Sequence, residues 1–293
     1  MRVSLRSLLV GCIAFGLVLG VGSGAWGQVD PELLRDAESG NAEAQNLLGV
    51  MYDTGEGVAE DDAEAVKWYR KAAEQGHEDA QFILGVAYVT GEGVAENDAE
   101  AAKWFRKAAE QGHAEAQYTL GLAYALGKGV AENDAEGVEW FRKSAEQGHA
   151  TSQFNLGLAY ADGRGVSEND VEAAKWWRKA AEQGLAGAQS NLGAMYETGQ
   201  GVAEDDVEAV KWYRKAAEQG HATAQYNLGV MHANGRGVVQ NYVLAYMWIN
   251  LSRMQGDEDA RKGMEMLVDR MTKEQIAEAQ KMAREWPAHR ANE

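Results

Sequence analysis

The stretch AQFILGVAYVTGEGVAENDAEAAKWFRKAAEQG, residues 80–112, determines the fold of this chain. In its first half, small and apolar side chains recur at spacings of four, seven and eight residues, from Ala80 to Tyr88. These spacings place them on one face of an α-helix. Gly85 leaves room on that face for a neighbouring helix, and Gly91 is the residue type that ends a helix in the left-handed conformation.

The second half of the stretch predicts another amphipathic helix. Asn97 is followed by Glu100 three residues later, a pattern typical of a helix start, and Gly112 marks the end. Between these residues the apolar face contains Ala101, Trp104, Phe105, Ala108 and Ala109. The opposite face is charged, so the stretch predicts two helices that each bury one side.

The same pattern recurs six times, with a period of 36 residues and no insertion or deletion. Three columns show it: Gln45, Gln81, Gln117, Gln153, Gln189, Gln225; Trp68, Trp104, Trp140, Trp176, Trp212, Trp248; and Gly57, Gly93, Gly129, Gly165, Gly201, Gly237. One helix pair cannot bury its own apolar faces, so the period predicts stacked repeats that share a core.

The motifs Ala-Gln-x-x-Leu-Gly-x-x-Tyr, Gly-x-Gly-Val and Ala-x-x-Trp-Tyr/Phe-Arg-Lys resemble the Sel1-like repeat, a relative of the tetratricopeptide repeat. The resemblance covers residues 40–256. It implies an all-α, right-handed superhelical solenoid of six 36-residue helix–turn–helix repeats, with a capping half-repeat at 28–39 and capping helices at 257–293. Proteins with such repeats mostly serve as adaptors or scaffolds.

The pattern of residues 1–27 is typical of a signal peptide. Arg2 and Arg6 precede an apolar run over residues 8–21, and the small residues before Gln28 predict cleavage between Gly27 and Gln28. We therefore expect an exported protein, periplasmic or secreted. An uncleaved membrane anchor and lipidation at Cys12, the only cysteine, are the alternatives.

The charge of the chain disfavours nucleic acid as a partner. The net charge is −17, and removal of residues 1–27, with two arginines and no acid, would make it −19. Binding to a phosphate backbone needs a concentrated basic face, which the sequence lacks. After signal removal no segment is apolar enough to cross a membrane.

The sequence offers no candidate catalytic residue, cofactor or metal site. Four histidines occupy the same position of successive repeats, with Leu185 in the fifth: His77, His113, His149 and His221. Equivalent positions lie about one helix spacing, roughly 10 Å, apart, so these histidines cannot share a metal ion. The acidic loops before the second helices fit helix starts, with calcium binding as the weaker alternative. Nucleophile and phosphate-loop motifs are missing.

A surface therefore remains as the candidate functional feature. Tetratricopeptide geometry implies that the first helix of each repeat lines a concave groove. The groove-facing side chains would be Phe82, Val86, Val89, Tyr118, Leu122, Leu126, Phe154, Leu158, Tyr226 and Val230. The alternative is that their aromatic rings pack one repeat against the next.

We predict a non-catalytic scaffold or adaptor of the cell envelope that binds a peptide or partner protein in this groove. A cell-wall- or β-lactam-directed enzyme and a secreted effector that engages a foreign cell are the alternatives. The sequence leaves the identity of the partner and the oligomeric state open.

Overall fold

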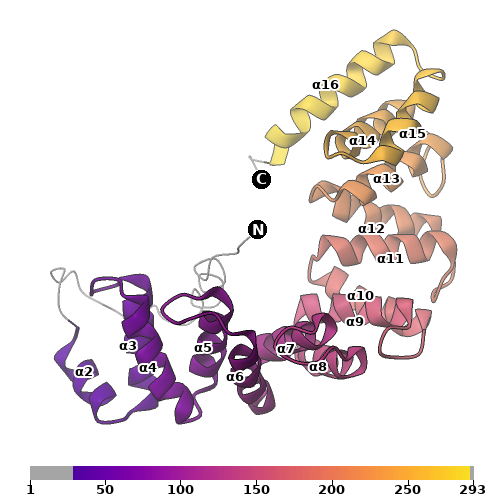
Figure 1. Cartoon of the computed structure of the whole chain (residues 1–293). Helices are drawn as coiled ribbons and strands as arrows, with labels where there is room; N and C mark the ends of the chain where they lie inside the picture. Colours follow the sequence, from indigo (N-terminus) through magenta and orange to yellow (C-terminus); the bar gives the residue numbers. More distant parts are fainter. Residues whose placement is uncertain (1–28, 291–293) are drawn as a thin grey trace. The chain divides into compact units, whose positions relative to one another are not determined.

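The computed structural model describes residues 29–290 and, within them, contains fifteen helices and no strand (Figure 1). The predicted signal peptide and its cleavage site lie outside the described residues. None of the helices in the described part is long and apolar enough to cross a membrane.

The helices follow the predicted order of one short helix, six helix pairs and two terminal helices. They are α2 (Pro31–Glu38), α3 (Ala42–Thr54), α4 (Asp62–Glu74), α5 (Glu78–Thr90), α6 (Asp98–Gln111), α7 (Ala114–Leu126), α8 (Asp134–Glu146), α9 (Ala150–Asp162), α10 (Asp170–Glu182), α11 (Ala186–Thr198), α12 (Asp206–Glu218), α13 (Ala222–Asn234), α14 (Tyr242–Met254), α15 (Glu258–Val268) and α16 (Lys273–Arg290).

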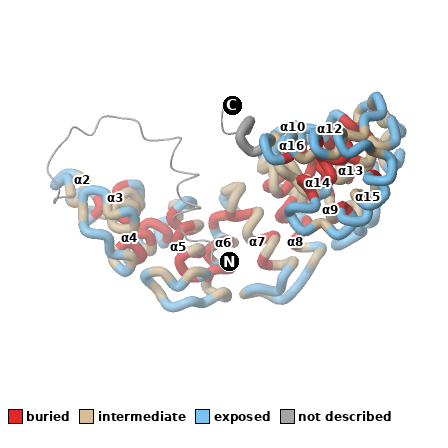
Figure 2. Tube along the Cα trace, turned by 90° about the horizontal axis from the view of Figure 1, so that it is seen from above, coloured by how far each residue is buried: buried red, intermediate tan, exposed pale blue. Residues whose placement is uncertain are grey.

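The helices form two compact units. The first ends at Gln147 and contains α2 to α8; the second begins at Gly148 and contains α9 to α16. In each unit the buried residues follow the helices, whereas the exposed residues concentrate in the connecting loops (Figure 2). Each unit has a core of alanines, one leucine per first helix and large rings from the second helices.

Within every repeat the first helix crosses the second at a glycine. A methyl group added to Gly85 would lie 2.6 Å from the ring of Phe105, so only glycine fits there. The same contact recurs in the pairs Gly49–Tyr69, Gly121–Phe141, Gly157–Trp177, Gly193–Tyr213 and Gly229–Ile249. The close approach predicted from Gly85 is confirmed.

The loop glycines are required for a different reason. Gly93 has a φ of +67°, and a Cβ atom there would lie 2.1 Å from the backbone oxygen of Asp62 in the preceding repeat. Both the left-handed conformation and the missing side chain are therefore needed for one loop to pack on the next repeat.

The second helices begin with half of the capping arrangement that the sequence suggests. The side chain of Asn97 accepts hydrogen bonds from the N–H groups of Ala99 and Glu100. The carboxylate of Glu100 pairs with Lys103 and does not reach back to the N–H of Asn97. That N–H donates instead to the carbonyl of Tyr88 at 2.8 Å. The loop is thereby fixed to the end of the first helix.

Within each unit, buried glutamines connect a repeat to the one before it. The amide of Gln81 donates to the carbonyl of Ala73 in α4 at 3.0 Å and accepts from Gln111 at the end of α6 at 2.7 Å. Equivalent amide pairs are Gln45–Gln75, Gln117–Gln147, Gln153–Gln183, Gln189–Gln219 and Gln225–Gln255. The two bonds of Gln81 therefore tie α4, α5 and α6 to one another.

Two glycines of α11 should respond oppositely to substitution by alanine. In G193A the new methyl group would lie 2.7 Å from the Tyr213 ring, so we expect a loss of about 1–3 kcal/mol of unfolding free energy. In G187A the nearest atom is 3.4 Å away, in Phe154, and better helix propensity should make it neutral or stabilising by up to about 1 kcal/mol. Urea unfolding measures both; equal destabilisation would contradict the packing argument.

The glutamine pairs predict a second asymmetry. Q81L leaves the buried carbonyl of Ala73 without its donor, which should cost about 1–3 kcal/mol. Q111L removes only the exposed partner, and water can replace that amide, so the loss should stay below about 1 kcal/mol. Denaturant unfolding of the two variants, compared with the unsubstituted chain, gives the order of the two effects.

Candidate binding surface

A pocket of about 200 Å³ opens between α5, α6 and α7 in the first unit. Its wall is mostly apolar, with one acidic and one basic residue: Val89, Asp98, Ala101, Ala102, Phe105, Thr119, Leu122, Ala123, Leu126 and Lys128. Val89 is 41% exposed and Leu126 is 62% exposed. An apolar pocket with exposed aliphatic side chains can accept an apolar side chain of a partner.

The structure brings three of the ten predicted groove residues together in this pocket, namely Val89, Leu122 and Leu126. The other predicted residues of the first unit are half-buried. Of these, Phe82 and Val86 pack against the core of repeats two and three.

The aromatic rings of the predicted groove pack between neighbouring helices. Phe82 stacks on His113 with 4.8 Å between ring centroids and lies tilted on Phe105 at 5.8 Å. Tyr118 lies tilted on Phe141 at 6.0 Å. Part of each ring is thereby covered, and the exposed large hydrophobic side chains described in this unit, Val89 and Leu126, are aliphatic.

In the second unit the four predicted residues are also half-buried. Phe154 and Leu158 pack against the core of repeats four and five. Tyr226 and Val230 pack against α14 and the terminal helices. Their part in a groove therefore stays a prediction.

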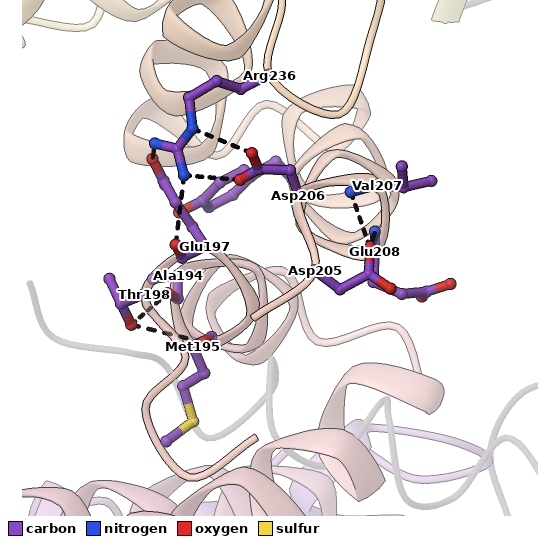
Figure 3. Close-up of polar contacts among 10 residues, drawn as sticks. Ala194, Met195, Glu197, Thr198, Asp205, Asp206, Val207, Glu208 and Arg236 are labelled. Atoms are coloured by element: carbon purple, nitrogen blue, oxygen red, sulfur yellow. Dashed lines mark hydrogen bonds and ion pairs between the residues drawn. The ribbon is translucent and has the colours of Figure 1, made fainter. Parts of the chain in front are cut away.

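A polar network occupies the end of α11 in the second unit (Figure 3). Arg236, in the loop after α13, binds both oxygens of Asp206 at 2.7 and 3.1 Å. Its third nitrogen binds Glu197 at 2.9 Å, and the hydroxyl of Tyr213 donates to the same carboxylate at 2.7 Å. Burial and the Glu197 carboxylate raise the pKa of Tyr213, so its hydroxyl stays protonated. The network connects α11, α12 and the loop after α13.

Our sequence reasoning missed this network, although a signal for it exists. Tyrosine occupies the position facing the glycine contact in two repeats, as Tyr69 and Tyr213, and an acid precedes each by sixteen residues, Asp53 and Glu197. Burial and the Asp53 carboxylate also raise the pKa of Tyr69. A buried hydroxyl needs a polar neighbour, so tyrosine and acid occur together.

The histidine column caps the first helices. The Nδ1 atoms of His77, His113, His149 and His221 each accept the backbone N–H three residues later, at 3.1–3.3 Å. The Nε2 atoms of His77 and His113 face Glu43 and Asp79 of the preceding repeats. Hydrogen bonding to His113 lowers the pKa of Asp79. The expectation that these are turn residues at helix starts is confirmed.

The acidic loops also have a structural role, because one residue of each loop caps the helix that follows. Asp61, Asn97, Asn133, Asn169 and Asp205 each accept the N–H of the third residue of the following helix. Between residues 29 and 290, no three side chains of metal-ligand type lie together.

Comparison with known proteins agrees with the repeat. The Sel1 repeat model matches six consecutive segments: 42–77, 78–113, 114–149, 150–185, 186–221 and 222–257. The chain therefore belongs to the Sel1 repeat family, whose members generally mediate protein–protein interactions. None of the curated proteins compared with the chain is significantly similar to it.

Two solved structures are similar along most of the chain. A protective antigen of uropathogenic Escherichia coli strains, with an SLR fold, is 37% identical; the match has a TM-score of 0.78 and covers 89% of this chain and 57% of the antigen. A Sel1 repeat protein from Oxalobacter formigenes is 32% identical, with a TM-score of 0.67 and coverage of 81% and 70%. This chain thus spans little more than half of the antigen.

The cap at His221 predicts a stability that depends on pH. Burial lowers the pKa of His221 from its ordinary value of 6.5, so the unfolded chain binds the proton first as pH falls. The cap's contribution is therefore complete above pH 6.5 and is lost as pH falls through the lower, folded-state pKa.

Asparagine is the matched substitution, because Asn41 caps α3 at the equivalent position. H221N should keep the cap and lose less stability than the unsubstituted chain between pH 7.5 and 5. Urea midpoints at both pH values test this. An unchanged pH dependence in H221N would exclude His221 as its source.

Proposed function

We propose that this chain is a non-catalytic scaffold or adaptor of the cell envelope, which binds a peptide or partner protein through the first helices of its repeats. The observation that carries the proposal is the pocket between α5, α6 and α7, with its exposed Val89 and Leu126. Exposed aliphatic side chains around a pocket are typical of a surface that binds another chain.

The polar side chains that could serve catalysis have structural roles. His77, His113, His149 and His221 cap first helices, and an aspartate or asparagine in the preceding loop caps each of α4, α6, α8, α10 and α12. The Glu197 and Asp206 carboxylates are bound by Arg236. With these groups engaged in the repeat architecture, a surface is the feature left to carry the function, which favours binding over catalysis.

The envelope location rests on the N-terminal sequence. Its basic start, apolar run and small residues before Gln28 are those of an export signal. Similarity to a protective antigen is compatible with export.

Site-specific photocrosslinking in the producing cell tests the binding surface. A crosslinking amino acid at Leu126 should capture a defined partner, because this side chain is 62% exposed beside the pocket. The matched control is Val171 on α10, which is also 62% exposed but lies outside the pocket.

The proposal further predicts that L126D abolishes recovery of that partner and leaves thermal stability unchanged, whereas V171D leaves recovery unchanged. Capture of the same proteins at both positions, or equal recovery with L126D, would count against binding at this pocket. Fractionation of the cells, followed by detection of the chain, tests the envelope location separately.

A further inference from the structure

A column of arginines on the second helices binds the tyrosines of the following first helices. Arg106 donates to the hydroxyl of Tyr124 and lies over its ring. Arg178 donates to the hydroxyl of Tyr196 at 2.6 Å. Arg70 lies over the ring of Tyr88, 5.7 Å from its centroid. These three arginines are half-buried.

The sixth repeat departs from this column. His232 stands where the other repeats have tyrosine, and it is only 3% exposed. Its Nδ1 atom is buried without a partner among the described residues. Burial and the nearby Arg214 lower the pKa of His232, so its ring is neutral at pH 7.

Arg214, the arginine that faces His232, therefore has no tyrosine to bind. No hydrogen bond, ion pair or ring contact engages its guanidinium within the described part of the chain. Arg214 is exposed, in contrast to the half-buried arginines of the same column. The substitution at position 232 thus leaves one guanidinium available.

Arg214 lines a pocket of about 470 Å³ between α12 and the turn after α13. The pocket combines cationic and apolar side chains with two acids: Lys211, Arg214, Lys215, Val207, Val210, Trp212, Val238, Glu208 and Glu218. Lys211 is paired with Glu208 at 2.5 Å, and the amine of Lys215 lies 4.2 Å from the centre of a Trp212 ring. Arg214 is the cation that remains for a ligand.

We infer that this pocket binds the C-terminal carboxylate of a polypeptide that ends in an aliphatic residue. The planar guanidinium of Arg214 can bind both oxygens of a carboxylate. The last residue of a chain carries its carboxylate and its side chain on one carbon atom. The same residue can therefore reach Arg214 and place its side chain among Val207, Val210 and Val238.

Charge supports an anionic ligand at this place. The chain as a whole is acidic, with a net charge of −17, yet three cations face two carboxylates around the pocket. Apolar neighbours reduce the screening of Arg214 and strengthen its attraction to a carboxylate. The pocket shares no residue with the Val89–Leu126 pocket, so it is a second site and does not depend on the first.

Fluorescence anisotropy with the purified chain tests the inference. The probe is a fluorescein-labelled hexapeptide ending in leucine, and its matched control is the same peptide with a C-terminal amide. The free carboxylate should bind at least about tenfold more tightly than the amide, since a charge-assisted pair is lost in the amide.

Three variants assign the binding to Arg214. R214Q should weaken binding of the carboxylate peptide about tenfold or more. H232Y should do the same, because it restores the hydroxyl that binds Arg106 and Arg178 in their repeats. R178Q, in the same column but already bound to Tyr196, should leave binding unchanged.

Equal affinity for the carboxylate and amide peptides, or undiminished binding by R214Q, would overturn the inference. Circular dichroism shows whether each variant is folded. If H232Y does not fold, R214Q decides alone, since Arg214 is exposed and its loss removes no internal contact. L126D should bind the peptide normally, which separates a failure at this site from a failure of the proposed function.

Discussion

The contact between a glycine of the first helix and a large side chain of the second is the constraint on which each repeat depends. With no Cβ at Gly85, the two backbones approach until the Phe105 ring lies against the glycine. This approach brings the surrounding alanines into contact, and alanines alone could not fill a wider gap. Buried glutamines then fix the spacing between repeats, because an amide such as Gln81 must keep its partners in α4 and α6.

Because the repeats are so regular, they differ from one another mainly at the positions where a residue departs from the 36-residue pattern. Some departures compensate each other: Tyr213 brings a buried hydroxyl, and Glu197 accepts from it while binding Arg236. The departure at position 232 has no such compensation. His232 fills the space of a tyrosine but leaves Arg214 without its hydroxyl partner. The guanidinium of Arg214 therefore lies at the surface with no role inside the repeat. A polar group of this kind indicates a binding site better than one that is already paired within the fold.

The local features of the fold could be predicted from the sequence. Which aromatic rings stay exposed and which are covered could not. The helix ends and the glycine contact near Gly85 follow from residues within one repeat. The exposure of Phe82 depends on His113, the N-cap residue of α7, which stacks on its ring. The hydrogen bond from the N–H of Asn97 to the Glu100 side chain does not form, because the carbonyl of Tyr88 accepts that N–H. The division into two units at Gln147 has no counterpart in the unbroken period.

The capping column shows how much variation the frame tolerates. Asn41 and His221 cap their helices with different side chains, and Leu185, the N-cap residue of α11, makes no side-chain capping hydrogen bond. A missing cap costs about 1 kcal/mol, which the burial of Leu192 and Met195 in the same helix can exceed. Because neighbouring repeats hold each helix in place, a position at its end can change its chemistry without unfolding the chain. The same tolerance allows position 232 to exchange tyrosine for histidine and thereby create a surface that differs from every other repeat.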